Sequence, residues 1–427
     1  MSKKSTLILD NVKVDKLVHG GQGIAETQDG RKIFLWGGLP GEIVNVLVTK
    51  KKRSYIEGVV TDVISPSVDR VEPVEPEVYL SSSPWQIMSL EAENNAKQAI
   101  LEETFSREGV YISKWGNFSF AGNEYGYRNK VELSFWGDDN GVHYASYVRG
   151  THGKQIITRN ALANESINSV LDDFLESLNS FIDKYKYRAG DFKTVILRSN
   201  KKGEVVAALF TKLDADFRQF TKPANLKGLI ICYSNPKSPA SVRTKDLYIN
   251  GDITLSDTLM GTNIIYDVFS FFQVNLPIFE QTLGRINYFA GGMPKIDMYS
   301  GVGAIGIPIG MTDILVESDE NNVKMAKMNA SNLPIKVVHA MSETVLDYID
   351  SKHSIIVDPP RAGLHKDLIN KILEVLPPQI IYLSCNPSTQ ARDVAILQEK
   401  YNIRAAEGYN FFPRTPHIES LVVLEKK

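Results

Sequence analysis

From about residue 267 the chain alternates short apolar runs with helical segments, and this alternation constrains the fold most strongly. The apolar runs recur at the spacing of β-α-β units, which is typical of a parallel sheet covered by helices. The expected strands are residues 295–299, 312–317, 335–340, 354–358, 379–384, 402–408 and 419–425. The pattern predicts an α/β domain, residues 266–427, with a Rossmann-like, doubly wound sheet of seven strands. Ligands of such sheets bind at the carboxyl ends of the strands.

A cofactor motif follows the first two of these strands. Gly301 and Gly303 come shortly after Asp297, and glycines at such a turn let a ligand approach the backbone closely. Glu317 ends the second strand, where a carboxylate can accept hydrogen bonds from both hydroxyls of a ribose. The two motifs fit a dinucleotide or S-adenosylmethionine. The acidic start and the missing third phosphate-loop glycine favour S-adenosylmethionine, which has no pyrophosphate.

Reactive side chains are expected at the same edge of the sheet. The prolines of Asp358-Pro359-Pro360-Arg361 fix a rigid bend that directs Asp358 and Arg361 toward the site. Cys385 follows the fifth strand at a polar helix start, where a helix N-terminus is expected to lower the thiol pKa. Glu419 opens the last strand. A thiol, two carboxylates and an arginine match covalent attack on a pyrimidine ring followed by its alkylation.

Each of these residues also has a simpler interpretation. Cys385 could be a buried structural cysteine, which is the usual role of a single cysteine. Arg361 could be a surface arginine in a plain turn. The polar neighbours Ser384 and Asn386, and the place of both motifs at strand ends, favour the chemical interpretation.

Residues 1–65 predict a small all-β barrel of the OB type, because short alternating strands are separated by glycine turns. Its basic focus is Lys50, Lys51, Lys52 and Arg53. A four-residue charge run is usually a solvated turn. On a small barrel it makes contact with RNA more plausible.

Residues 66–265 predict a separate central α+β domain. A proline-bearing linker opens it, and a helix over about 89–107, with Ser89 as N-cap, is expected to pack on the catalytic domain. Further on, a strand over 130–136 and a helix over about 166–184 are expected, without the rhythm of a parallel sheet.

Composition limits the class of protein. The net charge of −2 means that affinity for nucleic acid must come from local patches. Two cysteines exclude a disulfide framework and a protein-only four-cysteine cluster. No apolar run reaches the roughly 20 residues that a membrane helix needs, and none follows the first residues as a signal peptide would. We therefore expect a cytoplasmic protein, acting as a monomer without a metal.

At this point the motifs resemble those of a known family, the RNA 5-methyluridine methyltransferases. The C-terminal motifs are Phe271-Phe272-Gln273-Val274-Asn275, Asp297 to Gly303, Asp358-Pro359-Pro360-Arg361, Ser384-Cys385-Asn386-Pro387 and His417-Ile418-Glu419. The N-terminus resembles a TRAM domain at Gly20-Gly21-Gln22-Gly23, Leu39-Pro40-Gly41-Glu42 and Arg70. The central part is similar only at Gly126-Tyr127-Arg128-Asn129-Lys130. Many relatives carry four cysteines for an iron–sulfur cluster after the barrel, and this chain has none there.

The resemblance implies a role for each matched residue. Cys385 attacks C6 of a uracil in RNA, and Glu419 removes the C5 proton after methylation. Asp358 and Arg361 hold the polar edge of the uracil. The implied S-adenosylmethionine contacts are Gln273, Tyr299, Gly301, Gly303, Ala304, Glu317 and Asp358. The implied RNA contacts are Lys50, Lys51, Lys52, Arg53, Arg128 and Phe271. No iron–sulfur cluster is expected.

The implied substrate is 23S ribosomal RNA, with the T-loop of transfer RNA as the alternative. Three other functions compete with RNA uracil-C5 methylation. They are a non-catalytic RNA-binding protein with a methyltransferase fold, an N- or O-methyltransferase and a nicotinamide oxidoreductase. Cys385 and Glu419 argue against the first, and an N- or O-methyltransferase needs no cysteine nucleophile.

Overall fold

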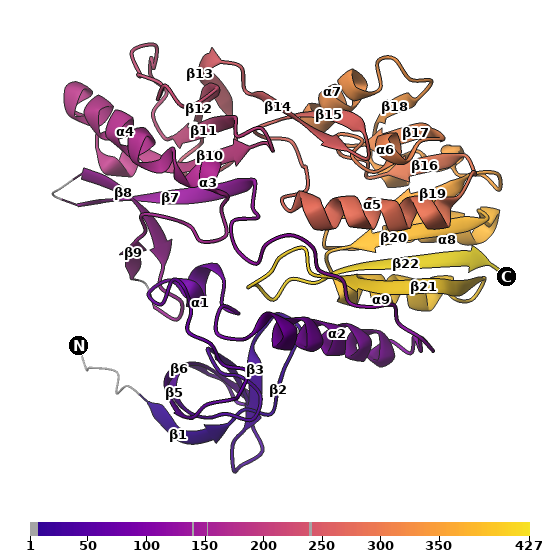
Figure 1. Cartoon of the computed structure of the whole chain (residues 1–427), viewed down its shortest axis with the longest axis horizontal. Helices are drawn as coiled ribbons and strands as arrows, with labels where there is room; N and C mark the ends of the chain where they lie inside the picture. The colour runs from indigo at the N-terminus through magenta and orange to yellow at the C-terminus, as the bar shows by residue number, and fades with distance from the viewer. Residues whose placement is uncertain (1–6, 139–140, 152, 239–240) are drawn as a thin grey trace. The chain divides into compact units, whose positions relative to one another are not determined.

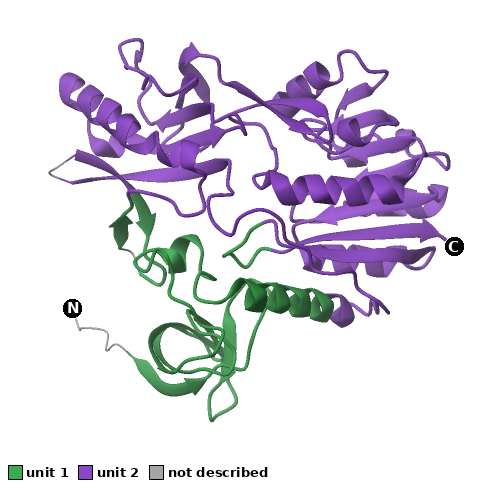
Figure 2. Cartoon of the chain, in the orientation of Figure 1, with its two compact units in different colours: residues 1–104, 145–157, 412–417 green, residues 105–144, 158–411, 418–427 purple. Residues whose placement is uncertain are grey.

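The computed structural model describes residues 7–138, 141–151, 153–238 and 241–427, so the start of the chain considered above lies outside the described residues. The chain forms two compact units (Figure 2). Unit 1 comprises residues 1–104, 145–157 and 412–417, and unit 2 comprises residues 105–144, 158–411 and 418–427. The domain boundaries at residues 65 and 265 stay predictions.

The N-terminal barrel of unit 1 has the expected all-β construction. Its strands are β1 Ile8–Lys13, β2 Lys16–Leu17, β3 Gly23–Glu26, β4 Lys32–Trp36, β5 Ile43–Lys51 and β6 Tyr55–Ser65. They are ordered β1-β5-β6-β4-β3-β2, and because β1 runs almost directly into β2, the chain itself links the two edges. Alternate side chains fill the interior, among them Val14, Ala25, Ile33, Leu35, Val44, Val46 and Ile56.

Two buried ion pairs hold unit 1 together. Glu42 is fully buried and accepts from Arg70 Nε at 2.6 Å and from Arg70 Nη2 at 2.7 Å. Glu42 and Arg70 both belong to the motif that resembles a TRAM domain, so in this chain they serve the structure of the barrel. Lys97 and Glu93, 2.8 Å apart, are both buried on helix α2, Leu90–Arg107. Their partners include the 412–417 segment, since Lys97 donates to the Phe412 carbonyl. The predicted cap is confirmed, because Ser89 Oγ accepts from Ala92 N.

The region between the barrel and the last sheet forms a mostly antiparallel sheet of seven strands, ordered β13-β12-β11-β10-β7-β8-β9. The strands are β7 Lys130–Asp138, β8 Gly141–Tyr147, β9 Lys154–Ile156, β10 Phe192–Ser199, β11 Val205–Thr211, β12 Gly228–Tyr233 and β13 Lys245–Gly251. Only the pair β11–β12 is recorded as parallel, so the expected absence of a parallel rhythm is confirmed among the described residues. A hairpin, β14 Thr254–Leu259 and β15 Thr262–Asp267, follows.

The helix expected over 166–184 is two helices. They are α3 Glu165–Asn168 and α4 Leu171–Tyr185, and Ser169 and Val170 separate them. Asn164 caps α3 by accepting from Ile167 N. Another short helix, α1 Tyr79–Ser82, lies within the segment predicted as a linker.

The C-terminal sheet confirms all seven expected strands, each within one residue. They are β16 Lys295–Met298, β17 Thr312–Glu317, β18 Lys336–His339, β19 Ser354–Val357, β20 Gln379–Ser384, β21 Tyr401–Tyr409 and β22 Glu419–Lys426. Their order is β18-β17-β16-β19-β20-β22-β21. β22 is antiparallel to both neighbours, while the remaining pairs are parallel. The order reverses between β16 and β19, and ligands bind at such a switch point.

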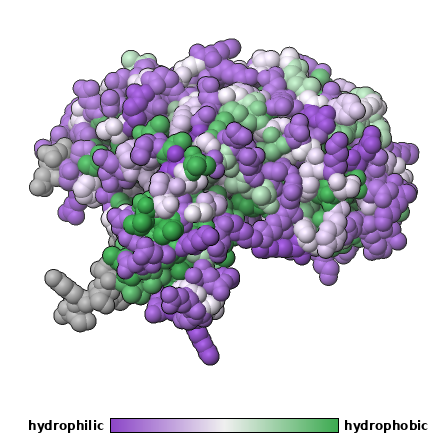
Figure 3. All heavy atoms as spheres, turned by 60° about the horizontal axis from the view of Figure 1, so that its bottom comes forward, coloured by the Kyte–Doolittle hydropathy of each residue, from purple (hydrophilic) through white to green (hydrophobic). Residues whose placement is uncertain are grey.

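Helices cover both faces of this sheet (Figure 1). They are α5 Leu276–Ala290, α6 Gly306–Ile309, α7 Glu320–Asn329, α8 Lys366–Val375 and α9 Pro387–Leu397, with 3-10 turns at 342–344 and 346–348. The helix expected after the glycine motif, α6, is a single turn, because Gly310 at φ 70° ends it. None of the described helices combines the length and the apolar character that crossing a membrane requires. On the face drawn in Figure 3, hydrophobic atoms appear as patches among hydrophilic ones.

Candidate active site

Three of the four predicted catalytic residues lie at one edge of the C-terminal sheet because of strand direction. Asp358 and Cys385 each follow directly on a parallel strand, β19 and β20. Glu419 opens β22, which runs the other way, and Ser384 pairs with Ser420. A thiol and two carboxylates from distant parts of the sequence are therefore neighbours. The fourth residue, Arg361, is exposed on the loop after β19 and interacts with the Cys385 thiol.

Helix α9 fixes the loops that carry these groups. Its N-cap, Asn386, donates from Nδ2 to the Arg361 carbonyl at 2.8 Å, and Thr389 Oγ1 donates to the same carbonyl at 3.2 Å. Gln390, which is buried, donates to the Tyr382 carbonyl at 2.8 Å and to the Ser420 carbonyl at 3.2 Å. These two hydrogen bonds tie β20, which leads to Cys385, to β22, which begins with Glu419.

The structure contradicts the predicted ionisation of Cys385. Desolvation raises the pKa of the half-buried thiol to about 11, and the charges of Glu419 and Asp358 add to the rise. Arg361 opposes it through a side-chain hydrogen bond and its charge, but does not prevail. The expectation that the helix start lowers this pKa is wrong, because burial and two carboxylates outweigh one helix N-terminus. At neutral pH the free protein holds Cys385 mainly as the thiol.

Burial also raises the pKa values of the carboxyl groups at this edge. Glu419 is 2% exposed, and its pKa lies well above the ordinary value because of desolvation and the Asp358 charge. The pKa of Asp358 is raised to about 7 by desolvation. Within the described part of the chain, Glu419 Oε1 is a buried oxygen without a hydrogen-bond partner. Such an atom costs stability unless something polar reaches it, which is typical of a site built for a ligand.

A small pocket joins this edge to the cofactor motif. The residues that line it include Phe271, Gln273, Tyr299, Gly301, Ala304 and Asp358, so it collects most of the predicted cofactor contacts. Asp358 belongs both to this pocket and to the surroundings of the thiol. The two groups of residues therefore form one site.

The glycine motif after β16 has the backbone that a close turn requires. Gly303 has φ 84°, and a Cβ there would come within 2.5 Å of Ile307 Cδ1. Gly301 has φ 55°, and Tyr299 adopts φ 64° even though it has a side chain. Asp297 is fully buried and accepts from Gly306 N at 2.9 Å, which ties the end of β16 to α6. Burial raises the pKa of Asp297 to about 8.

Glu317 already has several backbone donors. Its Oε2 accepts from Gly301 N at 2.8 Å, and its Oε1 accepts from Ser318 N at 2.8 Å and Asp319 N at 2.7 Å. A carboxylate has about four acceptor positions, so about one remains. Contact with both hydroxyls of a ribose, as predicted, requires the release of at least one backbone donor.

The segment before α5, which carries Phe271 and Gln273, is held by residues that the sequence analysis did not assign to the site. Arg198, fully buried on β10, donates to the carbonyls of Asp267 at 3.0 Å, Ser270 at 2.5 Å and Phe272 at 3.0 Å. Asn129 donates from Nδ2 to the Gln273 carbonyl at 3.1 Å. An arginine inside an apolar strand was the signal that could have revealed Arg198.

The predicted RNA contacts lie in different parts of the molecule. The basic run of the barrel comprises the end of β5 and the turn to β6. Lys50 pairs with Glu57 at 2.7 Å, and Lys51, Lys52 and Arg53 are exposed. In unit 2, Arg128 is partly buried and lies over the Tyr127 ring. Phe271 is 62% exposed although it lines the small pocket.

Known proteins resemble both ends of the chain. Residues 305–427 match the family model described as tRNA (Uracil-5-)-methyltransferase, and residues 11–61 match that of the TRAM domain. An uncharacterized RNA methyltransferase of Caldanaerobacter subterraneus is 28% identical over 97% of this chain and 98% of its own length. Another, from Halalkalibacterium halodurans, is 28% identical over the whole of both chains.

A solved structure shares the fold. It is the tRNA (uracil-54, C5)-methyltransferase of Pyrococcus abyssi in complex with S-adenosyl-L-homocysteine, with 22% identity and a TM-score of 0.75 over 97% of this chain and 100% of that one. The predicted fold class is thereby confirmed. The family models and the relatives are similar to this chain at the C-terminal and N-terminal motifs identified in the sequence, and the solved structure shares its fold.

Proposed function

We propose that this protein methylates C5 of a uridine in RNA, with S-adenosylmethionine as methyl donor and a covalent bond between Cys385 and C6 of the uracil as intermediate. The observation that carries the proposal is the meeting of Cys385, Asp358, Glu419 and Arg361 at the sheet edge beside the cofactor motif. An N- or O-methyltransferase would have no use for a thiol at this position.

The residues of the site can carry out each step of such a reaction. The Cys385 thiolate adds to C6, and the electron pair of the C5–C6 bond makes C5 nucleophilic, with negative charge spread onto O4. Arg361 is placed to stabilise this charge, and Asp358 is placed to bind the polar edge of the ring by accepting from N3–H. After C5 has taken the methyl group, Glu419 removes the C5 proton. The electrons of that C–H bond re-form the C5–C6 double bond and expel Cys385 as thiolate.

The small pocket carries residues expected of a cofactor site, and its volume of about 20 Å³ must increase before S-adenosylmethionine can enter. Gln273, Tyr299, Gly301 and Ala304 line it, and Glu317 and Gly303 lie on the same motif. When bound there, S-adenosylmethionine would supply an electrophilic methyl group at a sulfonium. The Pyrococcus abyssi protein, which shares the fold, was solved with S-adenosyl-L-homocysteine.

The protonation states set a requirement on this mechanism. Cys385 holds its proton in the free protein, and the pKa of Glu419 is raised well above its ordinary value, since burial disfavours the charged forms of both groups. The nucleophile must lose its proton before the addition to C6, and the base must be ionised before it takes the C5 proton. Arg361 is the cation at the site that favours the thiolate.

For the RNA, we propose 23S ribosomal RNA as substrate. The second candidate is a uridine of the transfer RNA T-loop, which is supported by the similarity to the Pyrococcus abyssi enzyme over the whole chain and by the name of the matching family. We further propose that the protein acts as a cytoplasmic monomer, with RNA as its macromolecular partner. The proposed RNA contacts outside the site are Lys51, Lys52 and Arg53 of the barrel, and Arg128.

Two experiments test the function. Mapping of 5-methyluridine in total RNA, from cells with and without the gene, should show one or more modified uridines that disappear on deletion, and their position decides between the two RNAs. Glu419→Gln should transfer the methyl group but release the product slowly, so that a protein–RNA adduct accumulates. A variant with wild-type turnover and no adduct would show that another group is the base. An unchanged modification map would contradict the function.

A further inference from the structure

A large cleft in unit 2 lies next to the small pocket and has no part in the chemistry described so far. Its volume is about 1370 Å³. Its walls come from α7 with the residues after it, from the 267–271 segment and from the antiparallel sheet. The lining residues used below are Lys130, Arg243, Phe269, Phe271, Lys324, Lys327, Met328, Asp319 and Glu320.

The charge of the cleft favours an anion. Lys324 and Lys327 are exposed on α7, and neither forms an ion pair with a described carboxylate. Lys130 adds a partly buried amine, whose pKa is lowered to about 7 by desolvation and by the Arg198 charge. Two carboxylates, Asp319 and Glu320, also line the cleft. Asp319 is the N-cap of α7, where its side chain accepts from Asn322 N at 2.8 Å.

The cleft also offers flat and apolar surfaces beside these cations. Phe271 is 62% exposed and Met328 is 43% exposed. Arg243, held by Asp246, lies over the Phe269 ring with its guanidinium carbon 4.5 Å from the ring centre. An exposed aromatic ring, a guanidinium plane and unpaired cations together form a surface on which single-stranded nucleic acids stack.

The cleft adjoins the proposed active site at Phe271, which lines both the cleft and the small pocket. The position of Phe271 is fixed from α7, since Asn322 Oδ1 accepts from Phe271 N at 3.0 Å. Asn321 of the same helix donates to Asp267 Oδ1 at 2.8 Å. The helix that presents Lys324 and Lys327 therefore also positions the aromatic ring at the entrance to the pocket.

We propose that this cleft holds the RNA strand adjacent to the target uridine, with Lys324 and Lys327 on its phosphates and with Phe271 and the Arg243–Phe269 pair against its bases. The proposal rests on the function proposed above and adds to it a substrate class, a single-stranded or locally opened RNA segment. A folded acidic protein would match the lysines alone, whereas the exposed Phe271 ring beside them favours RNA. The base next to Phe271 belongs to the nucleotide that neighbours the target.

The test is the salt dependence of RNA binding. The probe is a single-stranded RNA oligonucleotide of adenosines with one uridine, titrated at several salt concentrations. Each phosphate contact to single-stranded RNA contributes about 0.7 to the slope of log affinity against log salt, so Lys324→Gln with Lys327→Gln should lower the slope by about 1.4. Between about 50 and about 200 mM salt, the variant should lose about sevenfold less affinity than the wild type.

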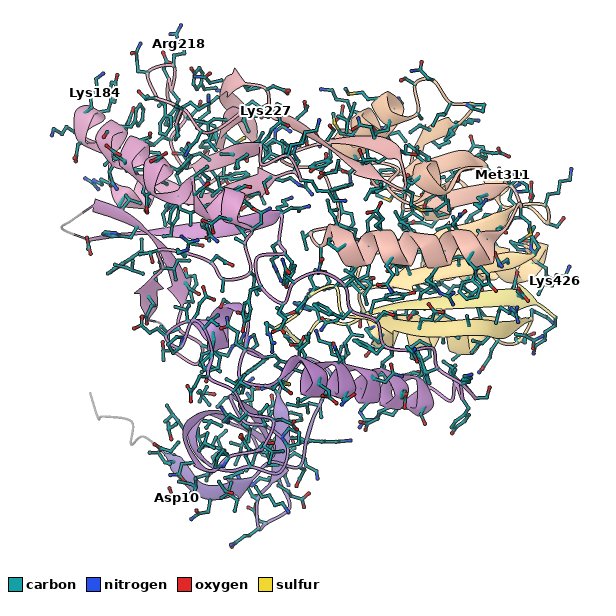
Figure 4. The ribbon with its side chains drawn as sticks, viewed as in Figure 1. Asp10, Lys184, Arg218, Lys227, Met311 and Lys426 are labelled. Carbon is teal, nitrogen blue, oxygen red and sulfur yellow. The ribbon has the colours of Figure 1, made fainter. Side chains whose placement is uncertain are left out.

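The matched control is Lys184→Gln with Lys426→Gln. These exposed lysines lie at the end of α4 and of β22, outside the cleft, and are labelled in Figure 4. The control should keep the wild-type slope, and both double variants should bind S-adenosylmethionine as the wild type does. In methyl transfer the cleft variant should show a raised KM for RNA.

The possible failures are distinguishable. Equal slopes for the wild type, the cleft variant and the control would overturn the cleft proposal, as would a wild-type protein that does not bind the oligonucleotide. Methyl transfer by the wild type in that case would leave the proposed function standing. A reduced slope together with no methylation of any RNA would support the cleft and contradict the proposed function.

Discussion

The thiol of Cys385 should titrate far above the pH at which a catalytic cysteine is usually expected to ionise. Its pKa is raised to about 11 because it is desolvated and faces Glu419 and Asp358. At pH 7 the thiolate fraction is then about 10⁻⁴, against about 0.03 for an ordinary thiol with a pKa near 8.5. The thiolate fraction of Cys385 is therefore about 300-fold smaller than that of an ordinary thiol. A more basic thiolate is also more nucleophilic, by about tenfold for this difference, so alkylation should be about 20- to 30-fold slower than for a free thiol.

The assay is alkylation by iodoacetamide without RNA or cofactor, followed by peptide-resolved mass spectrometry. The rate at Cys385 should rise about tenfold per pH unit from pH 7 and should still be rising at about pH 9.5. Peptide resolution separates it from Cys232, which is fully buried and whose pKa is raised to about 12. Asp358→Asn should move the profile to lower pH, since it removes a negative charge, and Arg361→Met should move it to higher pH. A plateau below about pH 8.5 in the wild type would refute the reasoning, because the thiol would then be ionised as the helix start alone predicts.

Three further results are expected. Arg198→Met leaves the carbonyls of Asp267, Ser270 and Phe272 without their buried donor, so the free energy of unfolding in urea should fall by about 3–5 kcal/mol. Arg218→Met, at the exposed position labelled in Figure 4, should leave the free energy of unfolding nearly unchanged, and equal losses for the two variants would mean that the buried hydrogen bonds do not matter. Neutralising Lys51, Lys52 and Arg53 together should lower the salt slope of RNA binding by about 2, and an unchanged slope would make this run a solvated turn. Protein purified without oxygen should contain no iron, because two cysteines cannot supply the four thiolates of a usual cluster, and stoichiometric iron would reveal other ligands.

Much of the C-terminal fold could be predicted because its signals are local. Each strand is a short apolar run bounded by turn residues, and a parallel sheet needs both faces buried, so the runs stand out. The same logic placed Asp358, Cys385 and Glu419 at one edge, since strand direction determines which ends meet. The break between α3 and α4 was not visible in the same way, because nothing in the apolar spacing marks Ser169 and Val170 as its place.

The ionisation of the site could not be predicted from sequence. A helix N-terminus is a local feature, whereas desolvation depends on which segments cover the thiol after folding. Desolvation is the largest cause of the raised Cys385 pKa, and the charge of Glu419, which lies far along the chain but faces the same space, adds to it. Arg198 was missed for a related reason, since its three partners lie about 70 residues later.

The central claim is covalent catalysis by Cys385, and the most direct measurement is trapping with RNA that carries 5-fluorouridine at the target position. Fluorine at C5 takes the place of the proton that Glu419 must remove, so the bond between Cys385 and C6 cannot be released after methyl transfer. The wild type and Cys232→Ala should form a complex with this RNA that survives denaturation, in the presence of S-adenosylmethionine, with the link mapped to Cys385. Cys385→Ala should form none and should transfer no methyl group. Methylation of ordinary RNA by Cys385→Ala, or a complex linked at another residue, would contradict the account.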